Sequence, residues 1–176
     1  DCGLPEDASQ LLPSTHEATA ELLNAVGYVD VCIPRGGRRL IDFVRDNARV
    51  PVIETGAGVV HAYIDRTADL QIARDVVNNA KTRRVSVCNA LDTMLIHHDR
   101  LPDLPAIVAP LADCNVEIHA DDEALYALNG HYPAQLLVKA LPEDFDTEWM
   151  DHKLGLRTVA SLDEALAHIA RYSSQH

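Results

Sequence analysis

Helix-like and strand-like segments alternate along most of this chain. Helical spacing of apolar residues, or a capping residue followed by such spacing, predicts helices at residues 16–26, 68–81, 104–111 and 121–128, another starting at 40, and a last one after 161. Short apolar runs predict strands at residues 28–33, 50–53, 59–64, 91–97, 116–119, 135–140 and 156–160. This alternation predicts an α/β fold with an open, mostly parallel sheet.

Caps and breaks refine the pattern. Thr67 is the expected N-cap of the 68–81 helix, and Ser161 with Glu164 forms a capping box before the last helix. The glycine-rich turn between Glu54 and Gly58 is the expected boundary between two α/β lobes.

Composition excludes several function classes. Hydrophobic residues make up 47% of the 176, enough for a packed core, and the net charge of −12 argues against binding a nucleic-acid backbone. A small anionic substrate stays possible, since a basic loop can sit in an acidic protein. No apolar run approaches the roughly 20 residues of a membrane span. The four cysteines are irregularly spaced without a CxxC pair, which favours free thiols and a cytoplasmic location.

Cys88 stands at the junction of a basic turn and an apolar run. Lys81, Arg83 and Arg84 lie just upstream, and Asn89 follows. Nearby cations and backbone N–H groups favour the thiolate, the nucleophilic form of cysteine. A free cysteine is also a common small core residue, so a structural thiol is the competing interpretation.

Two glycine turns follow strand-like runs. Glu54 ends one run and precedes Gly56 and Gly58, which would place a carboxylate in a cleft as a base or orienting group, or be an ordinary strand end. Pro34-Arg35-Gly36-Gly37 ends another run and precedes a helix. A helix N-terminus there would suit a phosphate, although a simple turn explains the glycines equally well.

The nine histidines show no metal-ligand spacing, and no metal is expected. His97 and His98 should point to opposite faces if both lie in a strand. The acidic residues around Phe145, near Trp149, are expected to form a solvated loop.

Taken in order, these segments resemble the γ-glutamyl phosphate reductases, which belong to the aldehyde dehydrogenase superfamily. The segments that carry the resemblance are 33–37, 51–58, 79–89, 116–121 and 161–166, of which the Ala-Lys-Thr-x-Arg…Ser-x-Cys-Asn segment at 80–89 is the most specific. The resemblance implies the end of a Rossmann-like cofactor domain at residues 1–55. It also implies a three-layer catalytic domain at 56–176 that is incomplete at its C-terminal end.

The resemblance also implies an activity. Such an enzyme reduces L-glutamate 5-phosphate to L-glutamate 5-semialdehyde with NADPH, releases phosphate and serves proline biosynthesis. Cys88 would attack the acyl phosphate to form a thioester, while Asn89 and Glu54 would belong to the catalytic site. Glu54 matches a glutamate that acts as a base in hydrolytic members of the superfamily. The net charge and the lack of a long apolar run lead us to expect no nucleic-acid or membrane partner. An unpaired edge of the incomplete sheet could make the chain a homo-oligomer.

Further roles follow residue by residue from the same resemblance. The implied cofactor-binding residues are Pro34, Arg35, Gly36, Gly37, Thr55, Gly56 and Glu148, of which Glu148 would hold the nicotinamide ribose. Lys81, Arg83 and Arg84 would bind the substrate phosphate or carboxylate.

The chain departs from the family in two respects. Val85 stands where the family commonly has proline. Family members are more than twice as long, so half of the dinucleotide site and the side-chain donor of the oxyanion hole would be missing. Loss of one such donor costs about 3 kcal/mol, and this chain is expected to be inactive alone.

Two other interpretations stay open. The chain could be a non-catalytic α/β binding module with Cys88 as a structural thiol. It could also be a cysteine hydrolase, which would need a histidine beside Cys88.

Overall fold

The computed structural model describes residues 3–54 and 58–173. The chain divides between Gly56 and Ala57 into two compact units. The units are described separately below.

The second unit is built on a parallel sheet of five strands in the order β1-β2-β5-β3-β4. The strands are β1 (His61–Ile64), β2 (Thr93–His97), β3 (Glu117–Ala120), β4 (Leu137–Lys139) and β5 (Lys153–Val159). All four strand pairs are parallel, with Thr93 opposite His61 and Gly155 opposite Thr93. The predicted α/β fold with a parallel sheet is therefore confirmed.

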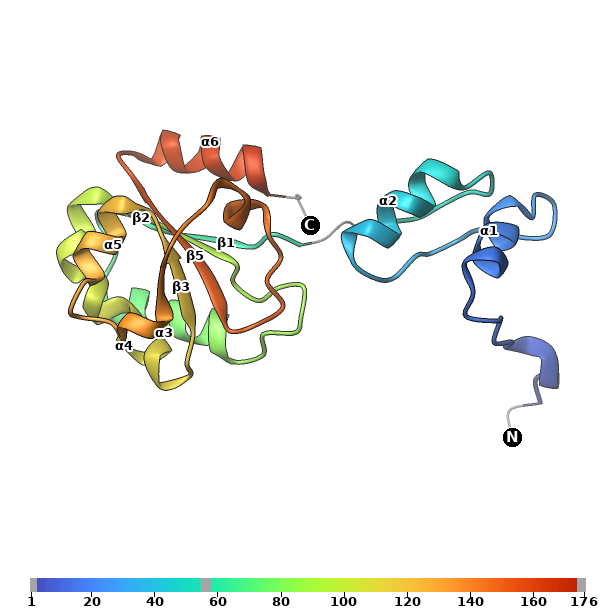
Figure 1. Ribbon diagram of the computed structural model, residues 1–176, viewed down its shortest axis with the longest axis horizontal. Helices are drawn as coiled ribbons and strands as arrows, with labels where there is room; N and C mark the ends of the chain where they lie inside the picture. The colour runs from blue at the N-terminus through green and yellow to red at the C-terminus, as the bar shows by residue number, and fades with distance from the viewer. Residues whose placement is uncertain (1–2, 55–57, 174–176) are drawn as a thin grey trace. The chain divides into compact units, whose positions relative to one another are not determined.

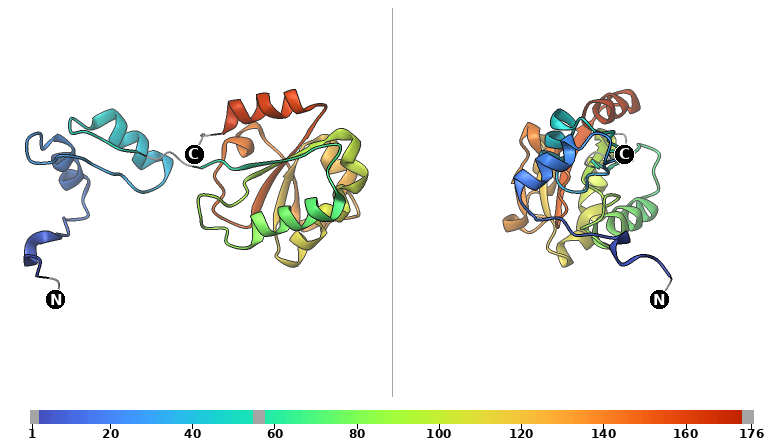
Figure 2. Two further views of the ribbon diagram at one scale, coloured as in Figure 1. Left: turned by 180° about the vertical axis from the view of Figure 1, so that it is seen from behind. Right: turned by 90° about the vertical axis from the view of Figure 1, so that its right-hand side faces the viewer.

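Helices cover both faces of the sheet, which gives three layers (Figure 1). Helices α3 (Leu70–Thr82), α4 (Leu104–Asp113) and α5 (Asp122–Leu128) share one core with the sheet. Helix α6 (Leu162–Tyr172) packs on the opposite face, as the left-hand view in Figure 2 also shows. Strand β2 is buried on both sides, since Met94 and Ile96 enter the larger core while Leu95 enters the smaller one under α6.

Side-chain caps start most of these helices. The Asp121 carboxylate caps α5, and the Ser161 hydroxyl caps α6 by accepting from the Glu164 N–H at 3.2 Å. The prediction that Thr67 caps α3 is wrong. The Asp69 carboxylate accepts from Ile72 N, while the Thr67 hydroxyl donates to Asp65 at 2.7 Å, because Asp65 follows β1 and organises the turn before the helix.

Short 3-10 helices complete the connections of this unit. They are η2 (His98–Asp103), η3 (Ala134–Leu136) and η4 (Pro142–Asp146). Among the helices formed by the described residues, none is long and apolar enough to cross a membrane.

The first unit contains η1 (Glu6–Ala8), α1 (His16–Asn24) and α2 (Arg38–Asn47). The strands predicted at 28–33 and 50–53 are reduced to one parallel bridge between Cys32 and Val52. A two-strand pair lacks the neighbouring strands that would extend its ladder, so the pairing stops after one bridge. Leu23, Ile41, Val44 and Val50 form the small core of this unit.

Candidate active site

Cys88 lies in the segment 83–92 that joins α3 to β2, and we call residues 83–90 of this segment the Cys88 turn. Two hydrogen bonds close its base: the Leu91 N–H donates to Ala80 O at 3.0 Å, and Lys81 Nζ donates to Leu91 O at 2.9 Å. The end of α3 and the start of β2 therefore hold the turn at both ends. The Cys88 side chain is exposed.

A recess of about 240 Å³ lies beside the Cys88 turn. Arg83, Arg84 and Asn89 contribute to its wall, and all three are exposed. Two guanidinium groups and an amide are donors suited to a phosphate or carboxylate. Within residues 3–54 and 58–173, Cys88 itself has no hydrogen-bond or ion-pair partner. No described histidine is therefore paired with it as a hydrolase would require.

Lys81 does not share this exposure. Its side chain is completely buried, and its ammonium group binds the Leu91 carbonyl. Burial lowers the pKa of Lys81 to about 8, against the attraction of Asp92 and Asp151. In this structure Lys81 fastens the base of the turn, and its predicted contact with substrate stays a prediction.

Asp92 is a buried carboxylate four residues after Cys88. Its Oδ2 accepts from Val60 N at 3.1 Å, and its Oδ1 accepts from Trp149 N at 2.9 Å. Burial raises the pKa of Asp92, and the Glu148 charge raises it further, while the two N–H donors and Lys81 oppose the rise. Glu148 therefore lies within electrostatic reach of Asp92.

The loop that carries Glu148 is also held by a cluster of polar side chains around His119. His119 Nδ1 lies 2.9 Å from Asp144 Oδ2, and its Nε2 lies 2.8 Å from Glu117 Oε1. The Trp149 ring packs against the His119 ring at 4.6 Å between centroids. Glu148 itself is half-buried. The predicted solvated loop is thus partly anchored to β3.

The glycine turn of the first unit leads into α2. Gly37 is the N-cap of this helix and offers no side chain, so the first N–H groups of α2 have no side-chain cap. Pro34 is buried, and Arg35, Gly36 and Gly37 are exposed. Exposed, uncapped N–H donors at the positive end of a helix suit a pyrophosphate, so these residues fit the predicted cofactor. Glu54 is exposed, whereas Thr55 and Gly56 lie outside the described residues.

Comparison with known proteins decides the family. No protein-family model matches the chain. The γ-glutamyl phosphate reductase of Pelodictyon phaeoclathratiforme is 57% identical over 174 residues, which are 99% of this chain and 42% of that protein. The chain belongs to the γ-glutamyl phosphate reductase family. It spans about two fifths of the length of the curated relatives that it matches.

Solved structures agree with this family at the level of the fold. A γ-glutamyl phosphate reductase from Thermotoga maritima matches with a TM-score of 0.84 and 36% identity, over 94% of this chain and 39% of that one. An engineered glycolyl-CoA reductase with bound NADP⁺ matches with a TM-score of 0.58 and 18% identity, over 90% of this chain and 42% of that one. The latter likeness concerns the fold alone.

The histidine pair differs from its prediction. His97 ends β2 and His98 begins η2, so the two rings stack at 4.6 Å instead of pointing to opposite faces. The strand alternation stops at His97, which explains the difference. Ligand atoms of His97, His98 and Asp99 lie within 4.8 Å of one another. His97 Nδ1 accepts from Asp99 N, which already engages one of these atoms.

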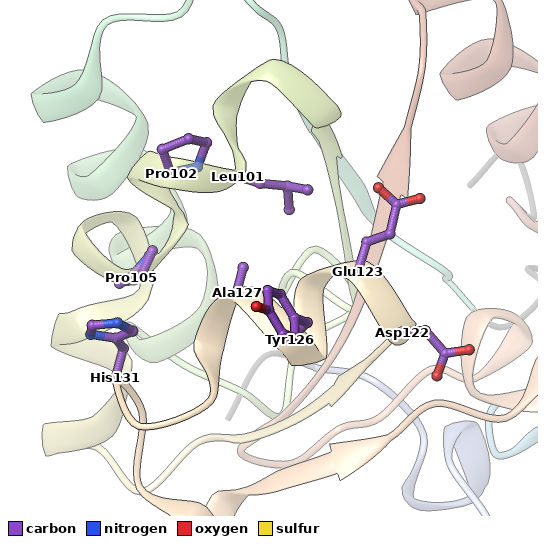
Figure 3. A pocket seen from close by; sticks show the side chains of 8 residues that line it. All are labelled: Leu101, Pro102, Pro105, Asp122, Glu123, Tyr126, Ala127 and His131. Atoms are coloured by element: carbon purple, nitrogen blue, oxygen red, sulfur yellow. The ribbon is translucent and has the colours of Figure 1, made fainter.

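An apolar groove of about 570 Å³ lies between η2, the start of α4 and α5 (Figure 3). Leu101, Pro105 and Tyr126 contribute to its wall, and Tyr126 is 84% exposed. None of the residues implicated by the reductase resemblance lines it. The groove is therefore separate from the proposed chemistry.

Sequence reasoning missed Asp92 as a site residue. One signal was available, because a charged residue follows Leu91 at the entry to an apolar strand, where an unpaired charge would be costly. His119 gave no comparable signal: Glu117 lies two residues before it on β3, but its other partner, Asp144, lies 25 residues further along the chain.

Proposed function

We propose that the protein containing this chain reduces L-glutamate 5-phosphate to L-glutamate 5-semialdehyde, a step of proline biosynthesis. The observation that carries the proposal is an exposed cysteine in a turn closed at its base and flanked by an arginine-lined recess. The family of the chain supports the same reaction. We assign residues 1–55 to the cofactor domain and residues 56–176 to the catalytic domain.

The proposed reaction begins at the thiolate of Cys88. Its Sγ attacks the acyl carbon of the substrate, a C–S bond forms, and the C–O bond to phosphate breaks. Phosphate leaves with the electron pair, so no acid is needed at the leaving group. In the later collapse of a thiohemiacetal, the C–S bond breaks, the aldehyde forms and the thiolate is restored.

The recess beside Cys88 would bind the anionic groups of the substrate. Arg83 and Arg84 supply the positive charge, and Asn89, the residue after Cys88, supplies an amide donor in the wall of the recess. A nearby backbone N–H would stabilise the developing oxyanion. Glu54 activates no water in the reductive direction, and we assign it an orienting role.

The cofactor is proposed to be NADPH. The turn Pro34 to Gly37 with the start of α2 would hold its pyrophosphate, and Thr55 and Gly56 would continue that site. Glu148 would hold the nicotinamide ribose. When bound, NADPH would supply the hydride that converts the thioester carbon to the aldehyde oxidation state.

A cytoplasmic location and a homo-oligomer complete the proposal. The competing binding module shares the fold and differs in thiol reactivity. Cys114 is a suitable internal reference because it is exposed, as Cys88 is. Faster alkylation of Cys88 by iodoacetamide below pH 8 supports the enzyme, and equal rates support the module.

The decisive test restores the length of a complete reductase. This chain would replace the matching 174 residues of the Pelodictyon phaeoclathratiforme enzyme, with Cys88 or with Cys88→Ala. We expect NADP⁺- and phosphate-dependent oxidation of the semialdehyde with Cys88, and a loss of about 10³-fold or more with alanine. The 176-residue chain alone should give no turnover. Equal activity of both chimeras would refute the assignment of Cys88.

A further inference from the structure

Asp92 connects three segments of the second unit that are far apart in the sequence. Its two carboxylate oxygens bind Val60 N, just before β1, and Trp149 N, next to Glu148. Its own N–H donates to Val60 O at 3.1 Å, and its carbonyl accepts from Gly155 N at 2.8 Å. Both carboxylate oxygens, the N–H and the carbonyl of Asp92 are therefore each hydrogen-bonded to another segment.

The neighbouring residue extends this connection to the Cys88 turn. Leu91 precedes Asp92 and carries both hydrogen bonds that close the base of the turn, one with Ala80 and one with Lys81. A displacement of Asp92 would therefore move Leu91 and the C-terminal end of the turn with it. On the other side, Trp149 would carry Glu148.

A carboxylate is chemically suited to this position. It accepts from two backbone N–H groups in different directions, and its charge faces the buried ammonium group of Lys81. The other charges acting on it are those of Glu148, while Asp151 acts on Lys81. An asparagine has one acceptor oxygen, so it would leave Val60 N or Trp149 N unpaired in the interior.

We propose that Asp92 is a positioning residue that fixes the Cys88 turn relative to the loop carrying Glu148. The inference rests on the function proposed above, in which Cys88 reacts with substrate and Glu148 holds the nicotinamide ribose. Asp92 does not touch the reacting atoms. Its role is to keep the nucleophile and the ribose-binding residue at one spacing.

The test compares Asp92→Asn with Asp121→Asn in the 176-residue chain. Asp121 is a matched control, because its carboxylate also accepts from two backbone N–H groups, Ala124 N at 2.9 Å and Thr158 N at 2.6 Å. Asp121 follows β3, whereas Asp92 precedes β2. Two signals are measured: the emission of Trp149, the single tryptophan of the chain, and the ratio of alkylation rates of Cys88 and Cys114.

Asp92→Asn is expected to shift the Trp149 emission to the red and to lower the Cys88-to-Cys114 rate ratio about fivefold. Asp121→Asn should reduce stability but leave both signals at the wild-type values. A folded Asp92→Asn variant with unchanged signals would overturn the proposal. So would an equal effect of the control variant.

Hydrogen exchange in the unmodified chain covers the case in which Asp92→Asn does not fold. The Val60 and Trp149 amides should exchange much more slowly than that of exposed Met150, about 100-fold or more. Exchange of the Trp149 amide at the Met150 rate would refute the connection. If wild-type Cys88 reacts no faster than Cys114, the proposed function fails instead, whatever Asp92 does.

Discussion

Replacement of Lys81 by methionine tests the buried charge at the base of the Cys88 turn. Burial lowers the pKa of this lysine from 10.5 to about 8 in the folded chain. The unfolded chain keeps the ordinary value. Between these two values the unfolded state binds more protons than the folded state, so the free energy of unfolding rises with pH.

The size of the effect follows from the two pKa values. Below pH 8 the folded state carries the full cost of a buried ammonium group, and this cost is relieved as pH rises toward 10.5. From pH 7 to pH 10 the lysine should therefore add about 2.5 kcal/mol to the free energy of unfolding. Methionine has a similar length and no charge, so its variant lacks this contribution.

Urea unfolding at several pH values, followed by Trp149 emission, measures the difference. Trp149 lies in the same unit as Lys81, so it reports on the unfolding of that unit. The control is Lys139→Met, because the Lys139 side chain is 64% exposed and pairs with Asp122 at the surface. The free energy of unfolding of wild type minus that of Lys81→Met should rise by about 2.5 kcal/mol from pH 7 to pH 10, while the difference between wild type and the control stays constant. Parallel curves for both variants would refute the burial of a charged Lys81.

Further predictions concern other parts of the chain. Burial lowers the pKa of His168 to about 4, so between pH 7 and pH 4.5 the unfolded state takes up a proton that the folded state does not. The free energy of unfolding should therefore fall by about 2.5 kcal/mol over this range. His168→Phe should remove this loss, as measured by acid unfolding. Inorganic phosphate should slow alkylation of Cys88 about threefold, and Arg84→Gln should abolish this protection. Protection that survives in the variant would contradict a role of Arg84 in binding phosphate. The chain should self-associate through the first unit, where Ile33 is 62% exposed next to the bridge between Cys32 and Val52. Light scattering should show less association for Ile33→Asp than for wild type. A monomeric wild type would contradict this prediction.

The arrangement of the second unit could be predicted largely from local patterns. The apolar run at 91–97 became β2, and the spacing at 68–81 became α3 with a shift of one or two residues. These elements form because their patterns match a sheet with helices on both faces. The strands of the first unit failed, since the strand at 28–33 depends on neighbours that a local pattern does not contain.

The candidate site was predictable in part. Cys88 and its arginines stood out because charge and a thiol are adjacent in the sequence. The connection from Asp92 to Trp149 spans 57 residues, and a contact of that range leaves no periodic signal. Lys81 was predicted to bind substrate together with the arginines, and no local pattern indicated that the last turn of α3 directs its side chain into the interior.

The central claim is that Cys88 forms a thioester with an acyl phosphate. Its most direct test is the intact mass of the chain after incubation with L-glutamate 5-phosphate in the absence of cofactor, followed by peptide mapping. We expect one glutamyl group per chain, attached at Cys88 and removed by hydroxylamine, with no adduct in Cys88→Ala. An adduct on another cysteine, or an equal adduct in the alanine variant, would contradict the account.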